Sequence, residues 1–535
     1  MSPILYRRIR MGVGTLVLVF CSLAFADVGQ WLSAPLLRAG LWTQSAPSLL
    51  SLMQGAGWMA GGCVAVLLLT LLFGRVYCAM LCPLGVLMDL SAKLSKRNGR
   101  NRRLSYQKGH PWLQTGVVAL VSFGLISGTA LPLAFLDPYS LFGKMISSTL
   151  RPLVGWANHG IASTHWIQPA DVSPVSWITS GVGLGLIGLI TLMAVRRGRL
   201  WCNTACPVGA VLGFFSRHAV FRLHLAESAC VGCSMCERVC PAQCIDFKHH
   251  RIDHSRCVMC MDCVTACRKH GISMVNSVGR NAASLPIFED PAVPAVTGKS
   301  ALPAVGRRLF LASAMILPTM SLAEERHCKG GGRGGGHGKG CRGGLNQFNK
   351  QAVLPPGAKS LAHFQSHCTA CQLCVVHCPD QVLRPSITQH GLAGFLQPFQ
   401  DFDVSFCSHH CSHCSQICPT GAIQAISVEE RKTVRTGVAE FFRGRCVVKT
   451  EGTSCGACSE HCPTQAVHMV AWKNGLTIPE VDPDLCIGCG GCEFICPVRP
   501  HKAIVVNGLK IHQRARPVPL GKENSVREME EEFPF

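Results

Sequence analysis

Four long apolar runs punctuate the first two hundred residues of this 535-residue chain, at 11–26, 55–73, 111–135 and 176–195. Each comes close to the ~20 residues that an α-helix needs to cross a hydrocarbon core about 30 Å thick. The apolar pattern therefore predicts four membrane-spanning helices. The first run follows a short basic start and also fits a cleaved signal peptide, with 23–26 (LAFA) as the cleavage site. We favour an uncleaved helix, because the later segments need its orientation.

Charge around the runs predicts their orientation. The connection 74–110 carries eight lysines and arginines, and three more arginines follow the fourth run within 196–199. The loops 27–54 and 136–175 carry only Arg38, Lys144 and Arg151. Basic loops stay in the cytoplasm, so both ends of a four-helix region are expected on that side.

Polar stretches after these runs are dominated by cysteine, of which the chain holds 33. Twenty-four of them fall into six groups of four. The groups are Cys230, Cys233, Cys236 and Cys240; Cys257, Cys260, Cys263 and Cys267; Cys368, Cys371, Cys374 and Cys378; Cys407, Cys411, Cys414 and Cys418; Cys446, Cys455, Cys458 and Cys462; and Cys486, Cys489, Cys492 and Cys496.

The first two groups have the spacing C-x2-C-x2-C-x3-C, which is typical of bacterial ferredoxins with two [4Fe-4S] clusters. In that arrangement three close cysteines hold one cluster and the fourth crosses to its neighbour. We therefore expect Cys267 to complete the first cluster and Cys240 the second. Paired zinc sites are the alternative reading of C-x2-C, and a disulfide framework is disfavoured because such near neighbours rarely suit S–S geometry.

The four later groups predict four more clusters, six in all. Spacing widens to x3 after Cys407 and to x8 after Cys446, so these two cysteines fit the pattern less closely than the others. Spacing alone does not assign the crossing cysteines in this half of the chain.

A second motif occurs twice, at 74–85 and 198–209, and reads G-R-x-[YW]-C-x3-C-P-x-G. Cysteines four residues apart on a helix share one face. The two pairs, Cys78 with Cys82 and Cys202 with Cys206, are therefore candidate metal ligands for one further iron–sulfur centre, or a redox dithiol. Buried thiols at a structural helix end are the other reading.

Residues 306–311 (GRRLFL) precede a short apolar stretch that ends small-x-small at 321–323. This resembles a twin-arginine export signal, with Ala323 as a cleavage point. It predicts a periplasmic location from Glu324 onward. The stretch is short for a membrane crossing, although it would be a fifth one if it spans, and a buried helix of a soluble domain is the alternative.

Residues 327–345 are rich in Gly and His and predict a flexible linker. Its His327, Cys328, His337 and Cys341 would bind a metal or form a disulfide in the alternative reading.

The whole chain carries a net charge of +21 with a mean hydropathy of +0.26. Membrane helices with basic flanks give both values. A nucleic-acid-binding protein also carries such charge, but here the basic residues flank apolar runs and form no patch with aromatics.

The predicted fold class is an α-helical membrane domain joined to α+β ferredoxin-like domains. The segments are a membrane domain at 1–220, a cytoplasmic two-cluster ferredoxin at 221–285 and a linker at 286–305; then the export-like segment at 306–323, a Gly/His linker at 324–357, a periplasmic four-cluster ferredoxin at 358–510 and a tail at 511–535.

These motifs together resemble a known family. Residues 1–285 resemble the NapH-type membrane ferredoxin of periplasmic nitrate reduction, which has relatives in nitrous oxide reduction and methylamine oxidation. Residues 306–510, with LPPGA at 354–358, are similar to the exported four-cluster partner NapG. The chain departs from the pattern at Arg268, where proline is usual, and in its Gly/His linker.

The resemblance implies a quinol dehydrogenase component, a membrane-bound protein that passes electrons from the quinol pool to a periplasmic reductase or cytochrome. Two other roles stay open: a ferredoxin that reduces metal or thiol centres while another enzyme matures, and an electron acceptor from a cytoplasmic ferredoxin or flavoprotein.

About 30 Å of hydrocarbon is expected to separate the two ferredoxin parts. We expect the quinone pool to connect them, with a centre at the repeated motif as the alternative. His110, His159 and His165 lie near predicted helix ends, where a lone histidine is more often structural.

Overall fold

The computed structural model describes residues 3–54, 57–97, 104–162, 177–277 and 351–517. The described residues on both sides of 278–350 belong to one compact unit. The export-like segment and residues 324–350 of the predicted Gly/His linker, with Cys328 and Cys341, lie outside the described residues, as does His165. The last residues of that predicted linker instead belong to the C-terminal module, where Val353 and Leu354 are buried in its core.

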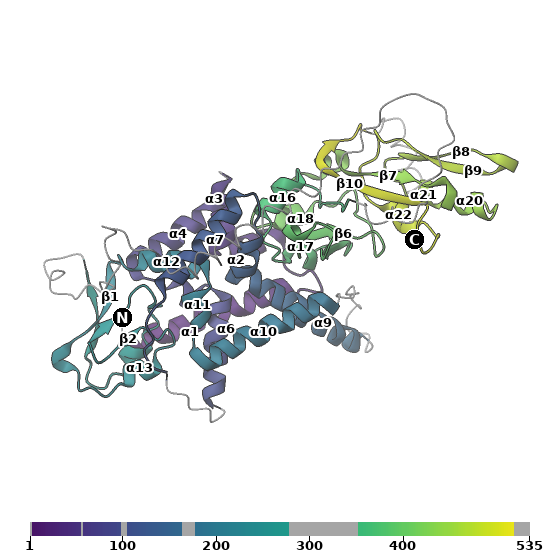
Figure 1. Ribbon diagram of the computed structural model, residues 1–535. Coiled ribbons are helices and arrows are strands. Elements are labelled where there is room, and N and C mark those ends of the chain that lie inside the picture. The colour runs from purple at the N-terminus through teal and green to yellow at the C-terminus, as the bar shows by residue number, and fades with distance from the viewer. Residues whose placement is uncertain (1–2, 55–56, 98–103, 163–176, 278–350, 518–535) are drawn as a thin grey trace, which may run out of the picture. The chain divides into compact units, whose positions relative to one another are not determined.

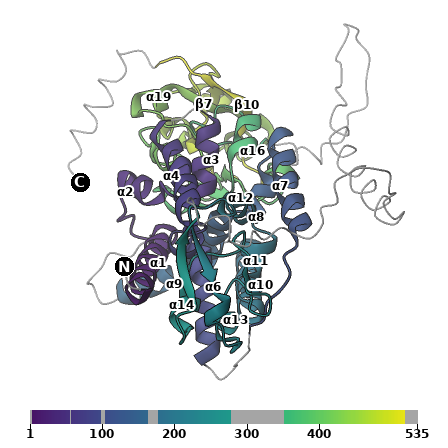
Figure 2. The same ribbon diagram turned by 90° about the vertical axis from the view of Figure 1, so that its left-hand side faces the viewer.

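The N-terminal region is helical (Figure 1). Its helices are α1 (Pro3–Ala26), α2 (Ala34–Leu41), α3 (Ser45–Met53), α4 (Gly57–Phe73), α5 (Tyr77–Met80), α6 (Pro83–Arg97), α7 (Pro111–Ile126), α8 (Leu131–Leu136), α9 (Pro138–Ala162), α10 (Trp177–Arg197), α11 (Leu200–Thr204) and α12 (Pro207–Ser216). Helices α1, α6, α9 and α10 pack against one another and lie side by side in Figure 2.

The four apolar runs correspond to α1, α4, α7 and α10. Among the described helices, α1 and α10 are long and apolar enough to cross a membrane, whereas α4 and α7 are shorter apolar helices. The third run differs most from its predicted extent, because α7 ends at Ile126. Gly128 takes a φ of +81°, and Pro132 then stands in the first turn of α8. A left-handed residue ends a helix and a proline suits the start of the next one.

Large apolar side chains on these helices point away from the protein. Leu16 on α1, Phe123 on α7 and Leu184 on α10 are each more than 60% exposed. Trp31, Trp112 and Trp177, next to helix ends, are more than 70% exposed. Exposed apolar faces mark membrane or partner surfaces, and tryptophans collect at membrane interfaces. The region is therefore suited to a lipid environment.

The first ferredoxin module is small and built from short elements. They are β1 (Phe221–Leu225), η1 (Glu227–Ala229), α13 (Met235–Val239), β2 (Ile245–Asp246), β3 (Arg251–Ile252), α14 (Asp262–Ala266) and β4 (Ile272–Asn276). β1 pairs antiparallel with β4, and β2 pairs antiparallel with β3. Their inward residues, such as Leu225 and Ile252, form one apolar cluster with the cysteines.

The C-terminal module repeats this construction twice. Its elements are α16 (Leu361–His367), α17 (Leu373–Val376), β5 (Leu383–Pro385), η3 (Leu392–Gly394), β6 (Pro398–Gln400), α18 (His413–Ile417), α19 (Val428–Thr433), β7 (Val434–Phe441), η4 (Arg443–Arg445), α20 (Val447–Thr450), α21 (Ala457–Glu460), β8 (Val467–Ala471), η5 (Lys473–Gly475), β9 (Thr477–Val481), α22 (Gly491–Ile495) and β10 (Ile504–Arg514). Two-stranded antiparallel sheets join β5 with β6, β8 with β9 and β7 with β10.

The two ferredoxin modules contact opposite ends of α1. At its start, the Tyr6 hydroxyl donates to Met259 O at 3.1 Å, and Arg10 pairs with Asp262 at 3.4 Å. At its end, His377 Nε2 lies 2.8 Å from Ala24 O. A helix of 24 residues rises about 36 Å from end to end. The modules are therefore separated by roughly one membrane thickness along this helix.

Candidate functional site

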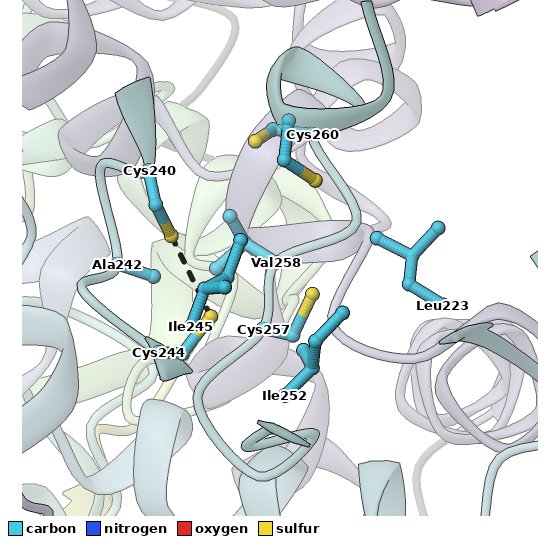
Figure 3. A pocket seen from close by; sticks show the side chains of 10 residues that line it. Leu223, Cys240, Ala242, Cys244, Ile245, Ile252, Cys257, Val258 and Cys260 are labelled. Atoms are coloured by element: carbon cyan, nitrogen blue, oxygen red, sulfur yellow. Dashed lines mark hydrogen bonds between the residues drawn. The ribbon is translucent and has the colours of Figure 1, made fainter. Parts of the chain in front are cut away.

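Thiols of the first module meet in the crossed arrangement that the spacing predicts. Cys257, Cys260 and Cys263 line one small cavity, and Cys240 from the other quartet lines it too (Figure 3). Leu223, Ile245 and Ile252 close it with apolar side chains. Cys230, Cys236 and Cys267 belong to the apolar cluster of the whole module, and the crossing of Cys267 to the first quartet stays a prediction.

The same crossing occurs twice in the C-terminal module, where the sequence left it open. One cavity is lined by Cys407, Cys411 and Cys414 together with Cys378 of the preceding quartet. Another is lined by Cys446, Cys455 and Cys458 together with Cys496 of the last quartet. Cys407 and Cys446, the two cysteines with irregular spacing, thus lie with their own quartets.

The two remaining groups in this module follow the same rule. Burial raises the pKa of Cys371 to about 12, and the nearby Cys418 thiol contributes to the rise. Burial likewise raises the pKa of Cys489 to about 12, with a contribution from Cys462. In both cases the contributing thiol is the fourth cysteine of the partner quartet.

Backbone geometry explains how three close cysteines turn toward one point. In four quartets the residues two and four positions after the first cysteine have positive φ. They are Gly232 and Ser234, Met259 and Met261, Ala370 and Gln372, and Gly488 and Gly490. Left-handed residues that are not glycine are costly and concentrate at functional sites. Their recurrence at matching positions indicates loops shaped around a common ligand.

The donor set fits iron–sulfur clusters better than single ions. Among the described residues, no group of three or more His, Cys, Asp or Glu side chains could hold one metal ion. Thiols around a cubane stand farther apart, because each bonds a different iron atom. Burial raises the pKa of most of these thiols, including Cys492. Coordination to iron would offset this, since a metal-bound thiol is deprotonated.

Cys244 is a fifth thiol at the cavity of Figure 3, and sequence reasoning did not single it out. Its Sγ lies 3.6 Å from that of Cys240. The contact lowers the pKa of Cys240 to about 7, because the Cys244 thiol acts as a hydrogen-bond donor to it. Cys244 lies immediately before β2 and outside the quartet spacing, so the sequence provided no signal for it.

The repeated motif brings four more thiols together. Cys78, Cys82, Cys202 and Cys206 are each at most 5% exposed. Besides burial, the neighbouring Cys202 and Cys78 thiols raise the pKa of Cys82, and the same two raise that of Cys206. The two copies, more than a hundred residues apart, thus form one buried group of thiols.

Local geometry differs from the single helical face expected for each pair. Cys78 lies on α5 and Cys202 on α11, but these short helices end before the second cysteine. Pro83 and Pro207 begin the next helices, α6 and α12. Cys82 Sγ accepts the Gly85 N–H at 3.4 Å and Cys206 Sγ accepts the Gly209 N–H at 3.2 Å. The second thiol of each pair is therefore an N-cap.

The arginines of the motif hold the two copies against each other, and its last glycine packs closely within each copy. Arg75 donates to Cys202 O at 3.1 Å, and Arg199 donates to Cys78 O at 2.6 Å. Both arginines are at most 1% exposed. A Cβ at Gly85 would clash with Cys78 O, and one at Gly209 with Cys202 O. These contacts account for the G-R and P-x-G positions of the repeat.

The repeated motif also abuts the crossed site of the first module. Arg75 donates to Ser255 O at 3.0 Å, and Asn203 donates to Ala242 O at 3.0 Å. Both acceptors lie within two residues of a cysteine that lines the cavity. Cys260 itself belongs to the same apolar cluster as Cys78 and Cys202. The two groups of thiols are therefore neighbours.

The C-terminal module packs on the far end of the helical region. Leu373 and Ile417, next to the cysteines of its first two quartets, join one cluster with Phe25, Leu37 and Phe142. Polar contacts surround this cluster: Ser51 donates to Pro419 O at 3.1 Å, Gln54 to Thr420 O at 3.0 Å, Ala130 N to Gln365 O at 2.9 Å, and Arg38 to Gln416 O.

Two of the histidines near predicted helix ends, His110 and His159, are described by the structure. His110 precedes α7 and His159 lies in the last turn of α9. No cavity described above is lined by either of them.

Comparison with known proteins supports the ferredoxin chemistry. A family profile described as a 4Fe-4S binding domain matches residues 55–101, 179–225 and 410–432, and one described as a 4Fe-4S dicluster domain matches 452–499. The first two matches cover both copies of the repeated motif. No solved structure matches the chain significantly.

Relatives include three ferredoxin-type proteins. The ferredoxin-type protein NapH of Haemophilus influenzae is 26% identical over 241 residues, 44% of this chain and 70% of the relative. The methylamine utilization ferredoxin-type protein MauN of Paracoccus denitrificans is 27% identical over 227 residues, 40% of this chain and 66% of the relative. The ferredoxin-type protein NapF of Escherichia coli is 29% identical over 160 residues, 30% of this chain and 87% of the relative.

The expected likeness to NapH-type ferredoxins is thereby confirmed. The chain carries 4Fe-4S ferredoxin domains and is related to iron–sulfur electron-transfer proteins. The likeness of residues 306–510 to NapG stays a prediction.

Proposed function

We propose that this chain is a membrane-bound iron–sulfur relay that takes electrons from quinol and delivers them to a periplasmic oxidoreductase. The observation that carries the proposal is the placement of two cysteine-rich ferredoxin modules at opposite ends of α1. A nitrate reductase is the acceptor class that the NapH relative suggests. A relay needs one-electron centres in series, and the crossed thiol groups offer them.

We assign six [4Fe-4S] clusters to the crossed groups. The sets are Cys230, Cys233, Cys236 and Cys267; Cys257, Cys260, Cys263 and Cys240; Cys368, Cys371, Cys374 and Cys418; Cys407, Cys411, Cys414 and Cys378; Cys446, Cys455, Cys458 and Cys496; and Cys486, Cys489, Cys492 and Cys462. When bound, each cluster accepts and releases single electrons. The apolar residues around the thiols exclude water, and the crossed cysteines join the clusters in pairs.

We further propose four membrane crossings, by α1, α4, α7 and α10. The basic loops place the first ferredoxin module in the cytoplasm. The contacts of the C-terminal module with Ala24 and α2, beyond the opposite end of α1, support a periplasmic location for it. The export-like segment at 306–323 would carry that module across the membrane.

Four buried thiols of the repeated motif are proposed to hold a further redox centre. The 4Fe-4S profile that spans both copies supports this, as does the charge around the thiols. Arg75 Nη2 lies 3.8 Å from Cys78 Sγ, where a guanidinium stabilises a thiolate. Their position beside the crossed site of the first module would extend the relay toward the membrane.

Metal analysis of anaerobically purified protein tests the assignment. Six cubanes predict about 24 iron atoms and as much acid-labile sulfide per chain, with EPR signals that appear on adding a quinol analogue. Iron in excess of about 24 atoms per chain that is lost in the double variant Cys78→Ser and Cys202→Ser would support the further centre at the repeated motif. Iron near eight per chain would contradict the relay, because the C-terminal module would then hold no clusters. A partner enzyme that lacks its own cofactor in a deletion strain would favour the maturation role.

A further inference from the structure

A cavity of about 320 Å³ lies between the C-terminal module and helices α9 and α10. Such a volume suits a small organic ligand. Lys144 and Arg151 of α9 line it on one side, and Thr179 and Val182 of α10 extend that wall. Gln372 and Val376 line it from the loop and helix of the quartet that begins at Cys368. The cavity therefore joins the helical region to an assigned cluster site.

The cavity lies at one end of a candidate membrane span. Thr179 and Val182 belong to the first two turns of α10, whose first residue, Trp177, is 93% exposed. The next residue, Ile178, is 52% exposed. Exposed tryptophan and isoleucine at a helix end are typical of the membrane interface. The cavity therefore lies beside a helix end whose exposed side chains suit the membrane interface.

Two buried polar atoms of the lining residues lack a partner among the described residues, one acceptor and one donor. Gln372 is 5% exposed, and its Oε1 accepts no hydrogen bond. The amide orientation is set by the other atom, because Nε2 donates to Leu396 O at 2.7 Å and Ala370 O at 3.2 Å. Arg151 is 8% exposed, and its Nε donates to no acceptor, whereas Nη2 donates to Val376 O at 3.0 Å. Buried polar groups without a protein partner are usually satisfied by water or by a bound molecule, and here both face one cavity.

We propose that this cavity binds the head group of the quinol, a ring with two hydroxyl groups opposite each other. One hydroxyl donates to Gln372 Oε1, and the other oxygen accepts from Arg151. Val182, Leu396 and Phe399 supply apolar contacts for the ring. The inference rests on the proposed relay and names the place where its electron donor is oxidised.

The chemistry balances with the cofactors already assigned. Oxidation of one quinol to quinone breaks two O–H bonds and releases two electrons and two protons. Cys368, Cys371, Cys374 and Cys418 would hold the cluster nearest the cavity, and this cluster and its neighbour would each supply a one-electron acceptor for the two electrons. The protons leave to water at the rim of the cavity, where Gln389 is exposed. Gln372 lies between two of the assigned cluster ligands, which gives the electrons a short path.

The test uses the full-length protein in liposomes with decylubiquinol as the probe, and follows anaerobic bleaching of the cluster absorbance. Gln372→Met removes the hydroxyl acceptor with little change in volume. Val404→Trp narrows the cavity at a residue that is 38% exposed, and Val428→Trp is its matched control, 39% exposed and outside the cavity. Iron content and reduction by dithionite report whether the clusters remain loaded.

We expect both cavity variants to be reduced by decylubiquinol about tenfold more slowly, with unchanged dithionite reduction, while Val428→Trp behaves as the parent protein. A photoreactive azidoquinone should label peptides of α9 or 372–404. Equal quinol rates in the parent protein and Val404→Trp would overturn the cavity assignment and leave the relay intact. Absence of quinol reduction in the parent protein would overturn the relay itself. If Gln372→Met loses iron, the quinol rate of Val404→Trp alone tests the cavity assignment.

Discussion

Buried arginines are the residues on which the repeated motif depends most. Arg75 and Arg199 each reach across to the backbone of the other copy, and Arg199 also pairs with Asp89 at 2.7 Å. The pairing holds the pKa of Asp89 below its usual range, because the Arg199 charge and hydrogen bond outweigh burial. A buried charge is tolerated only when paired in this way. These contacts explain why arginine follows glycine in both copies.

We predict that Arg199→Met destabilises the helical region by about 3 kcal/mol. The change leaves Asp89 with Arg10, at 3.6 Å, and the nearby charge of Lys93, and it removes the donor to Cys78 O. Thermal unfolding of the detergent-solubilised protein measures the loss. The exposed pair Lys432–Glu429 provides the control, since Lys432→Met should change stability by less than about 1 kcal/mol. Equal stability of the two variants would contradict the role given to Arg199.

Cys240 and Cys244 supply a second test at this scale. The crossed pattern assigns Cys240 to the cluster and leaves Cys244 as a hydrogen-bonding neighbour. Cys240→Ser should lower the iron content by about four atoms per chain, whereas Cys244→Ser should retain it. Iron analysis with EPR distinguishes them. Loss of iron in Cys244→Ser but not in Cys240→Ser would show that Cys244 is the cluster ligand and Cys240 its neighbour.

At the scale of elements, the short helices after α1 provide the surface on which the C-terminal module packs. Leu37 of α2 is fully buried in the cluster that includes Leu373 and Ile417. Its neighbour Leu36 is 49% exposed. Amphipathic helices bury one stripe and leave the other to solvent or lipid, and here the buried stripe faces the module.

We predict that Leu37→Ala weakens the packing of the C-terminal module against α2 by about 2–5 kcal/mol, while Leu36→Ala has little effect. The cavity left by Leu37 removes contacts to both Leu373 and Ile417. Hydrogen exchange of α18 should accelerate in Leu37→Ala, and reduction of the C-terminal clusters by quinol should slow. Iron content serves as the check on loading. Similar exchange in both variants would show that α2 does not hold the module.

For the whole molecule, the proposed topology puts the two ferredoxin modules, which contact opposite ends of α1, on opposite sides of the membrane. Figure 1 shows the first module near the N-terminus of α1 and the other beyond α2 and α3. Fusion of alkaline phosphatase to Phe535 should give an active enzyme, because the reporter folds only in the periplasm, whereas fusion after Ser277 should be inactive. A fluorescent reporter that folds only in the cytoplasm should show the reverse. An inactive phosphatase at Phe535 would place both modules on one side.

Much of the site followed from local patterns. Cysteine spacing predicted the six quartets and the crossing at Cys240, and the apolar runs located α4 and α10 to within two residues at each end. The first run began eight residues after the start of α1. The extent of the third run was wrong by about ten residues, because Gly128 and Pro132 ended a helix inside a stretch that stayed apolar. The role of each cysteine as a cluster ligand stays a prediction.

Sequence by itself determined the chemistry of this protein, since ligand type, spacing and hydropathy are properties of neighbouring residues. Tertiary structure alone decided which distant groups meet. It brought Cys378 to Cys407, joined the two copies of the repeated motif through Arg75 and Arg199, and formed the cavity lined by Arg151 and Gln372. The reason is physical: these contacts join segments tens to hundreds of residues apart, and packing, which acts across the folded chain, selects them.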